Sequence, residues 1–278
     1  MAAPCMSQSQ DAPDDIDLDD TVTTVQCHTT EDIIASGLIS GDVILSSFST
    51  TDCNRELKKF THHKKACRTL RFSEDGRQLY SASKDKSLLS LDVETGKLKK
   101  RIKNAHESPI YSMVVTGDRF LATGDDEGVL KVWDMRTKEA TVEMKECEDF
   151  ISDMIVDDNK KLIIASRSPI YCMVVTGDRF LATGDDEGVL KVGAQCPNGR
   201  RSETAEDLGL RVCMGYENKR SKECEDFISD MIVDDNKKLI IASSGEGTLT
   251  AFNIRRKRME LQSELFDSEL LCLAKMKV

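Results

Sequence analysis

Beyond its first thirty residues the chain alternates between short apolar runs and polar turn signals. Runs of four to seven β-favouring residues are separated by segments such as SEDG, SKDK, TGD and GDDEG. Such runs fit the half-buried surface of a strand, and turn residues between them favour antiparallel meanders. No long stretch repeats its apolar residues at helical spacing. The pattern therefore predicts an all-β fold.

The N-terminal segment differs from this pattern. It contains DAPDDIDLDD, which is acidic and includes a proline. A segment of this kind buries too little apolar surface to offset the entropy lost on ordering. We predict a disordered acidic tail over residues 1–25 and a folded region over residues 26–278.

Composition narrows the class of protein. The chain has 278 residues, 39% of them hydrophobic, which is enough for a sizeable core. Its net charge of -10 disfavours a general binder of nucleic acid, because such affinity depends on neutralising phosphates. The start lacks a basic and apolar leader, and no apolar run approaches the length of a membrane span. We interpret the chain as intracellular and soluble, with no membrane partner and its ten cysteines reduced.

No catalytic or metal-binding pattern stands out. The sequence has no CxxC pair, and its four histidines are not spaced with cysteines as metal ligands. The acidic GDDEG segments at 124–128 and 184–188 are interpreted as tight turns rather than metal sites. His106 could be a general base, but no nucleophile motif accompanies it. We predict no catalytic residue, no metal, no cofactor and no small-molecule substrate, so the chain is not expected to be an enzyme.

Two segments occur twice. SPIYSMVVTGDRFLATGDDEGVLKV at 108–132 recurs at 168–192, with Cys172 in place of Ser112. KECEDFISDMIVDDNKKLIIAS at 145–166 recurs unchanged at 222–243. Structural repeats normally diverge between copies, so this near-identity indicates a recent duplication.

One stretch carries a family resemblance. LATGDDEGVLKVWD ends in Trp133-Asp134, and His106 lies upstream in NAHESPI. A second unit, HHKKACRTLRFSEDGRQLYSASKDKSLLSLD, ends in Leu91-Asp92 in place of Trp-Asp. Both units resemble blades of the WD-repeat β-propeller family, which implies a hydrogen-bonded cluster of a His, a strand Ser or Thr, a turn Asp and the Trp. Transferred by position, the blade cluster comprises His63, Ser81, Asp85, His106, Thr123, Glu127 and Trp133, where Glu127 departs from the family's Asp by one methylene.

The spacing of these units tests the duplication. Ser46, Leu91 and Trp133 occupy the Trp position at steps of 45 and 42 residues, which matches the WD-repeat period. The next two such positions, Gly193 and Phe252, follow at steps of 60 and 59, and removing the 77 residues 167–243 restores a step of 42. We therefore predict an incomplete propeller of about four to five blade-like units that cannot complete a seven-bladed ring. The units are expected at 26–50, 61–96, 106–138 and 225–259, with a half blade at 149–166, a copied blade at 168–192, an irregular insert at 193–221 and the start of a further blade at 268–278.

The insert has a decipherable end. One choice of codons for residues 132–140, read from the third base, translates as MGYENKRS, which is the sequence of residues 214–221. We interpret the insert as partly the same gene segment read out of frame, so that it was not selected as protein. A functional loop inserted into a blade is the alternative.

Two basic runs remain, KLKKRIK at 97–103 and IRRKRME at 254–260. Either could serve as a nuclear-import signal or an RNA-contact patch, and solvated strand ends are the simpler alternative. The candidate patch comprises Lys97, Lys99, Lys100, Arg101, Arg255, Arg256, Lys257 and Arg258.

Three functional hypotheses follow. Residues 62–166 and 244–278 resemble nucleolar members of the family. The resemblance implies a non-catalytic scaffold in the nucleus and nucleolus that assists ribosome biogenesis and pre-rRNA processing. The implied partners are proteins of pre-ribosomal assemblies. The second hypothesis is a defective or mis-spliced product without stable function, which a cDNA read across residues 160–245 would test. The third is direct RNA binding through the basic runs, which salt-dependent binding lost on reversing the charge of Lys99, Lys100 and Arg101 would support.

Overall fold

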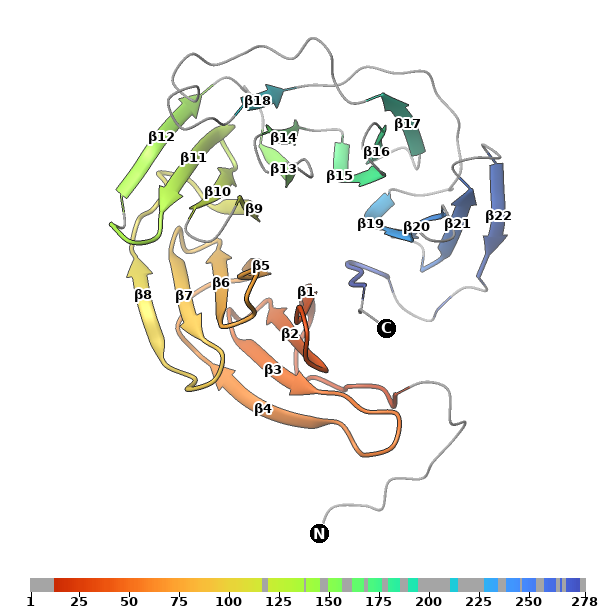
Figure 1. Cartoon of the computed structure of the whole chain (residues 1–278), viewed down its shortest axis with the longest axis horizontal. Coiled ribbons are helices and arrows are strands. Elements are labelled where there is room, and N and C mark those ends of the chain that lie inside the picture. Colours follow the sequence, from red (N-terminus) through yellow and green to blue (C-terminus); the bar gives the residue numbers. More distant parts are fainter. Residues whose placement is uncertain are drawn as a thin grey trace.

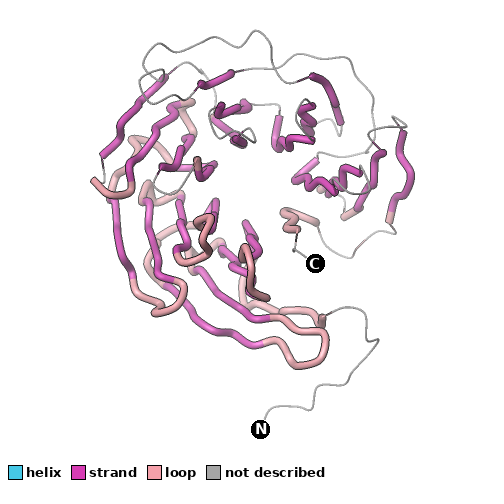
Figure 2. Tube along the Cα trace, viewed as in Figure 1, coloured by secondary structure: helices cyan, strands magenta, loops and turns pink. Residues whose placement is uncertain are grey.

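A computed structural model shows a chain built from strands. It describes residues 13–116, 120–137, 139–145, 150–156, 162–167, 170–176, 180–185, 190–194, 211–214, 228–234, 239–245, 247–253, 258–263, 266 and 269–275. These residues contain 22 strands and no helix (Figure 2). The predicted all-β fold is confirmed.

The strands form six sheets that follow one another around a central axis like the blades of a propeller (Figure 1). The first three sheets are four-stranded meanders. The first sheet contains β1 (Val22–Cys27), β2 (Ile33–Leu38), β3 (Val43–Ser47) and β4 (Arg55–Phe60). The second contains β5 (Cys67–Phe72), β6 (Gln78–Ser83), β7 (Leu88–Asp92) and β8 (Leu98–Ile102). The third contains β9 (Ile110–Val115), β10 (Phe120–Asp125), β11 (Val129–Asp134) and β12 (Glu139–Lys145).

The remaining three sheets contain the duplicated sequence. The fourth contains β13 (Ile151–Val156), β14 (Leu162–Arg167) and β18 (Arg211–Met214). The fifth contains β15 (Ile170–Thr176), β16 (Phe180–Asp185) and β17 (Leu190–Ala194). The sixth contains β19 (Ile228–Asp234), β20 (Leu239–Ser244), β21 (Leu249–Asn253) and β22 (Arg258–Gln262). Among the described strands, two sheets are therefore one strand short of a complete blade.

The residues at the Trp position occupy the same place in five sheets. Each pairs across a hairpin with an apolar residue of the second strand. The pairs are Ser46 with Ile34, Leu91 with Leu79, Trp133 with Leu121, Gly193 with Leu181 and Phe252 with Ile240. The spacing seen in the sequence thus corresponds to one structural position.

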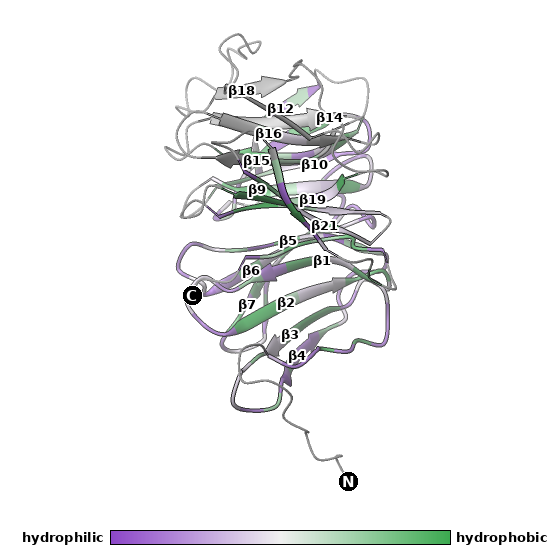
Figure 3. Cartoon of the chain, turned by 90° about the vertical axis from the view of Figure 1, so that its right-hand side faces the viewer, coloured by the Kyte–Doolittle hydropathy of each residue, from purple (hydrophilic) through white to green (hydrophobic). Residues whose placement is uncertain are grey.

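The outermost strands correct several of the expected unit boundaries. The units expected at 26–50, 61–96 and 106–138 each end before a fourth strand, namely β4, β8 and β12. The unit expected to end at residue 259 continues through β22 to Gln262. In Figure 3, β2 is largely apolar whereas β4 is largely hydrophilic. The sequence pattern did not indicate the outer strands because they lack the apolar runs that mark the inner ones.

The N-terminal boundary is also corrected. β1 begins at Val22, so residues 22–25 belong to a strand and not to the predicted tail. These residues read VTTV, and their β-branched side chains favour extended backbone. Before β1, the Asp20 carboxylate accepts hydrogen bonds from the backbone N–H groups of Thr21 (2.8 Å) and Ser40 (3.1 Å). Residues 1–12 lie outside the described part of the chain.

Part of the expected irregular insert forms regular structure. Residues 193–194 end β17, and residues 211–214 form β18, which pairs with β14 in parallel. This pairing satisfies backbone groups at an edge that the half blade would otherwise leave open. A parallel strand is unlike the antiparallel meanders of the other sheets, and it arises here because β15, β16 and β17 lie between β14 and β18 in the chain, so no hairpin joins the two. The rest of the insert lies outside the described residues.

The duplicated blocks repeat the same contacts between neighbouring sheets. Ser112 Oγ donates to the Ile151 carbonyl at 3.0 Å, and its copy Cys172 lies with Sγ 3.6 Å from the Ile228 carbonyl. Asp153 accepts the Met173 N–H at 2.8 Å, and its copy Asp230 accepts the Leu273 N–H at 2.7 Å. The duplicated blocks therefore form equivalent junctions at two places in the ring, although Ser112 and Cys172 differ.

The C-terminal residues take the place of an innermost strand. Residues 269–275 have no assigned strand, although the start of a further blade was expected at 268–278. They lie on the inner side of the ring close to β1 and β19 (Figure 1). Besides the Leu273 bond to Asp230, the Lys275 ammonium donates to the Val233 carbonyl at 2.8 Å. Residues 268 and 276–278 of this expected unit lie outside the described residues.

Candidate functional site

The third sheet holds one complete blade cluster. The His106 ring lies between Asp125 and Thr123, with Nδ1 2.9 Å from Asp125 Oδ2 and Nε2 2.6 Å from Thr123 Oγ1. Trp133 Nε1 donates to Thr123 Oγ1 at 2.8 Å. Because the carboxylate can only accept, Nδ1 carries the proton and Nε2 accepts from the threonine hydroxyl. All four side chains are buried, so the cluster ties β10 and β11 to the loop before β9.

The second sheet holds a variant of this cluster. His63 Nε2 lies 2.9 Å from Ser81 Oγ, and Nδ1 lies 2.9 Å from Ser87 Oγ. Ser87 in turn donates to Asp85 Oδ1 at 2.5 Å. Ser87 bridges the histidine and the acid, whose Nδ1 and Oδ1 atoms also lie 3.4 Å apart. Leu91 replaces the tryptophan as a fully buried apolar side chain. The sequence reasoning did not include Ser87 in this cluster.

The expected role of Glu127 is wrong. Its carboxylate lies 3.7 Å from Lys145 Nζ, and both side chains are largely exposed. Asp125, two residues earlier, binds His106 in its place. Asp125 pairs with Ile110 next to a register irregularity, and the second sheet has the same irregularity with Ser83 at the equivalent place, so only the third sheet has an acid there. Glu127 contributes its backbone N–H, which donates to Asp125 Oδ1 at 3.1 Å.

The cluster acids have lowered pKa values. Burial by itself raises the pKa of Asp125, but hydrogen bonds from His106 and from the Val129 N–H outweigh it and hold that pKa below its ordinary value. The pKa of Asp85 is also lowered, since bonds from His63 and Ser87 outweigh its burial. Both groups are therefore carboxylates at neutral pH and stabilise the fold in that form.

We expect Asp125→Asn to lower the free energy of unfolding at pH 7 by about 1.5–3 kcal/mol, the range for hydrogen bonds to charged groups. Because the folded pKa lies below the unfolded value, this contribution is present above the unfolded pKa near 3.8 and is lost as the pH falls through the folded pKa. Urea unfolding at pH 7 and near pH 3 measures both effects. Glu127→Gln is the matched control, and an equal loss in that variant would contradict the assignment of the acid.

The basic runs do not come together. Lys99 forms an ion pair with Asp92 at 2.7 Å, and the Lys100 ammonium donates to the Arg136 carbonyl at 3.1 Å. Lys97 precedes β8 and is exposed, while Arg101 lies within β8. Arg258 lies in β22, and Arg255, Arg256 and Lys257 lie outside the described residues. β8 and β22 are on opposite sides of the ring (Figure 1), so the described parts of the two runs do not form one surface.

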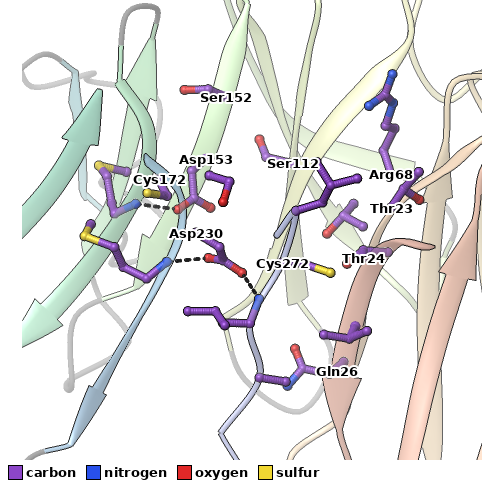
Figure 4. Close-up of a pocket in the computed structure, with 18 of the residues that line it drawn as sticks. Thr23, Thr24, Gln26, Arg68, Ser112, Ser152, Asp153, Cys172, Asp230 and Cys272 are labelled. Atoms are coloured by element: carbon purple, nitrogen blue, oxygen red, sulfur yellow. Dashed lines mark hydrogen bonds between the residues drawn. The ribbon is translucent and has the colours of Figure 1, made fainter. Parts of the chain in front are cut away.

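The innermost strands enclose a cavity of about 720 Å³. Its wall includes residues of β1, β5, β9, β13, β15 and β19 and of the C-terminal segment 271–275. Figure 4 shows Asp153 and Asp230 on one side of this cavity and Arg68 across from them. The wall is therefore polar and carries both signs of charge.

The two cavity carboxylates are repeats of one sequence position. Burial raises the pKa of Asp153 to about 7, while the nearby charge of Arg71 acts in the opposite direction. Burial also raises the pKa of Asp230, against the hydrogen bond from the Leu273 N–H. Within the described ranges, no group of three or more His, Cys, Asp or Glu side chains is arranged to hold a metal ion. The arrangement is suited to holding a polar chain by hydrogen bonds and charge.

Sequence reasoning did not mark this cavity. Asp153 and Arg68 are charged residues of strands that also contain apolar residues, a pattern that also fits solvent exposure. Their shared location depends on six strands meeting at the axis.

Among the described residues, no helix has the length and apolar character needed to cross a membrane.

Comparison with known proteins gives a consistent family. Residues 17–192 match the family described as Nucleolar protein 10-like, N-terminal domain, a β-propeller. The chain is 46% identical over 158 residues to WD repeat-containing protein 55 of Danio rerio, which covers 56% of this chain and 41% of that protein. It is 43% identical over 166 residues to the WD repeat-containing protein 55 homolog of Drosophila willistoni, covering 60% of this chain and 33% of that protein.

A third relative shows the same coverage. WD repeat-containing protein 55 of Pongo abelii is 40% identical over 167 residues, which is 60% of this chain and 43% of that protein. The chain thus matches less than half the length of each of these relatives.

Proposed function

Because this chain belongs to the family of Nucleolar protein 10-like N-terminal β-propellers, we propose that it is a non-catalytic interaction scaffold of the nucleolus that assists ribosome biogenesis and pre-rRNA processing. The WD-repeat propeller predicted from the sequence is confirmed by this family match and by the relatives. Propellers of this family are generally scaffolds, and the proposed partners are proteins of pre-ribosomal assemblies.

One structural observation carries the scaffold role. The histidines of the two blade clusters use both ring nitrogens inside their own sheets, as His106 does with Asp125 and Thr123. Their polar groups therefore stabilise blades and are not presented to a substrate. The polar cavity at the axis remains as a place where the described part of the chain can hold a partner.

The nucleolar role is tested in cells of the source organism. A fluorescent fusion of the chain should concentrate in nucleoli, and depletion of the protein should raise the level of unprocessed pre-rRNA. Re-expression of the chain should restore processing, whereas a variant with a broken blade, Trp133→Ala, should not. A diffuse fusion together with unchanged pre-rRNA would refute the proposal.

A product without stable function is the alternative that a specific observation favours. The fourth and fifth sheets contain three described strands each, and the fifth has Gly193 where the third has Trp133. Incomplete sheets expose backbone edges that promote aggregation. Excision of the duplicated segment, described in the Discussion, distinguishes this alternative from a working scaffold.

A further inference from the structure

The fifth sheet repeats the first three strands of the third sheet. β15, β16 and β17 come from the duplicated sequence at 168–192, as β9, β10 and β11 come from 108–132. The second and third strands of both sheets pair in the same register. The equivalent pairs are Ala122–Val132 and Ala182–Val192, Thr123–Lys131 and Thr183–Lys191, and Gly124–Leu130 and Gly184–Leu190. The two sheets therefore share one backbone arrangement up to their third strand.

The outer edges of these two sheets differ. In the third sheet, β11 pairs with β12, which is the fourth strand. Among the described strands, β17 pairs only with β16, since the copied sequence ends at residue 192 and omits the residues that form β12. One side of β17 thus lacks a strand partner within the described part of the chain. Such an edge is a template for an added strand.

The third sheet shows what kind of strand this edge accepts. Val142 and Met144 of β12 are buried and belong to a core cluster that includes Ile151 of the next sheet. Between them, Glu143 forms an ion pair of 3.2 Å with Lys131 of β11. Successive residues of a strand point to opposite faces. An acid between two apolar residues is therefore the pattern that completes this edge.

The neighbour of the fifth sheet repeats the neighbour of the third. In the sixth sheet, Ile228 and Met231 are the copies of Ile151 and Met154. They share a core cluster with Ala182 of the fifth sheet. Among the described residues, this cluster contains no side chain from a fourth strand of the fifth sheet. The place that β12 fills in the third sheet thus has the same surroundings here without its strand.

We propose that the outer edge of β17 binds an extended segment of a partner protein as the fourth strand of the fifth sheet, and that this segment carries an acidic residue between two apolar ones. This inference rests on the proposed scaffold function and names one surface and one class of partner for it. The segment pairs antiparallel to β17, as β12 pairs with β11. Its acid lies opposite Lys191, which has the register position of Lys131.

A separate partner fits this edge better than a second copy of the chain. Exchange of β12 between two copies fills the edge at β17 but opens the edge at β11, so the number of open edges is unchanged. Two β17 strands paired with each other offer no acid to Lys191, because β17 reads LKVGA. The occupant is therefore a strand that the chain does not itself supply.

The test uses the purified 278-residue chain and a labelled synthetic peptide EATVEMK, which has the sequence of β12. Replacing both its valine and its methionine with serine should weaken binding by about a hundredfold, since burial of each apolar side chain contributes about tenfold. A peptide with N-methylated backbone should not bind, because it lacks the donors for strand pairing. Fluorescence anisotropy measures binding. In hydrogen exchange, the EATVEMK peptide should protect residues 190–194 and leave residues 129–134 unchanged.

Charge exchange across the proposed pair supplies a matched control. Lys191→Glu should weaken binding of EATVEMK by about three- to fivefold, and the peptide EATVKMK should bind that variant better than EATVEMK does, because opposite charges on facing strands attract. Lys131→Glu makes the same change in the third sheet, where β12 already occupies the edge, and should leave the affinity unchanged. A chain without residues 167–243 lacks the fifth sheet and should not bind the peptide.

Several outcomes would overturn the proposal. These are no binding of EATVEMK, equal binding of the N-methylated peptide, or binding that survives the excision of residues 167–243. Dimers of the chain that the peptide dissociates would assign the edge to a second copy instead. The peptide series needs no variant protein, so it decides even where a substitution prevents folding. The assay is independent of the cell, so a failed nucleolar localisation and a failed peptide titration are separate results.

Discussion

Replacing Trp133 with alanine should lower the free energy of unfolding by about 3–5 kcal/mol, the range for truncating a buried aromatic side chain. Trp133 is 4% exposed and is the one tryptophan of the chain. Its ring packs in a core shared by the second and third sheets, with Tyr80 and Leu121 among its neighbours. Alanine removes this packing and leaves a cavity between two blades.

The hydrogen bond of Trp133 is lost as well, so Thr123 Oγ1 keeps only its contact with His106. Trp133→Phe is the matched control, because it retains most of the apolar surface while it removes the indole N–H. We expect that variant to lose roughly 0.5–1.5 kcal/mol for the hydrogen bond, together with a smaller packing loss. Urea unfolding followed by circular dichroism measures both, and a loss below about 1 kcal/mol for the alanine variant would contradict the blade assignment.

Excising residues 167–243 should give a chain with higher soluble yield, a larger monomer fraction and a sharper thermal transition. The excision joins Ser166 to Ser244, so that β13 and β14 continue directly into β21 and β22. The sixth sheet shows how this blade forms, because β19 and β20 repeat the sequence of β13 and β14 up to Ser166. There β20 pairs with β21 through Ile240–Phe252 and Ile241–Ala251.

The shortened chain keeps the contacts that the duplicated blocks share. Ser112 still donates to the Ile151 carbonyl, and Asp153 becomes available to accept the Leu273 N–H as Asp230 does now. It loses the fifth sheet, in which Gly193 stands at the position that Trp133 holds in the third. Exposed strand edges therefore decrease, and edges are the main cause of aggregation in sheets.

The excision also has a cost. The C-terminal segment now lies close to β1, where Cys272 contacts the Val25 backbone, and a ring with fewer sheets loses this contact. Size exclusion and thermal melting of both chains, expressed side by side, show which effect dominates. If the 278-residue chain is the more soluble and the more cooperative, the duplicated segment belongs to a working fold.

The outer strands illustrate where sequence reasoning fails. β4 and β8 read RELKKF and LKKRI, and most of their side chains are exposed. Such a strand is held by backbone pairing with the third strand of its sheet, so its side chains need no apolar alternation. The run KLKKRIK was interpreted as a nuclear-import signal, an RNA-contact patch or a solvated strand end, and most of it forms the fourth strand of a blade.

The blade cluster shows a second limit. Asp85 and Glu127 both lie four residues after the Ser or Thr of their cluster, and spacing alone predicts the same role for both. The structure uses Asp85 through Ser87 in one sheet and Asp125 directly in the other. Both sheets have the same register irregularity, and the second has Ser83 where the third has Asp125, so the residue at this position decides which acid reaches the histidine.

The sequence by itself determined the all-β class, the WD-repeat family, the duplicated blocks and the residues at the Trp position. Each of these is a local feature, since periodicity and motif spacing reflect which face of a strand is buried. The tertiary structure alone decided the fourth strands, the parallel pairing of β18, the acid of the third blade and the polar cavity at the axis. These features depend on contacts between residues far apart in the chain, and such contacts form only when the sheets meet around a common axis.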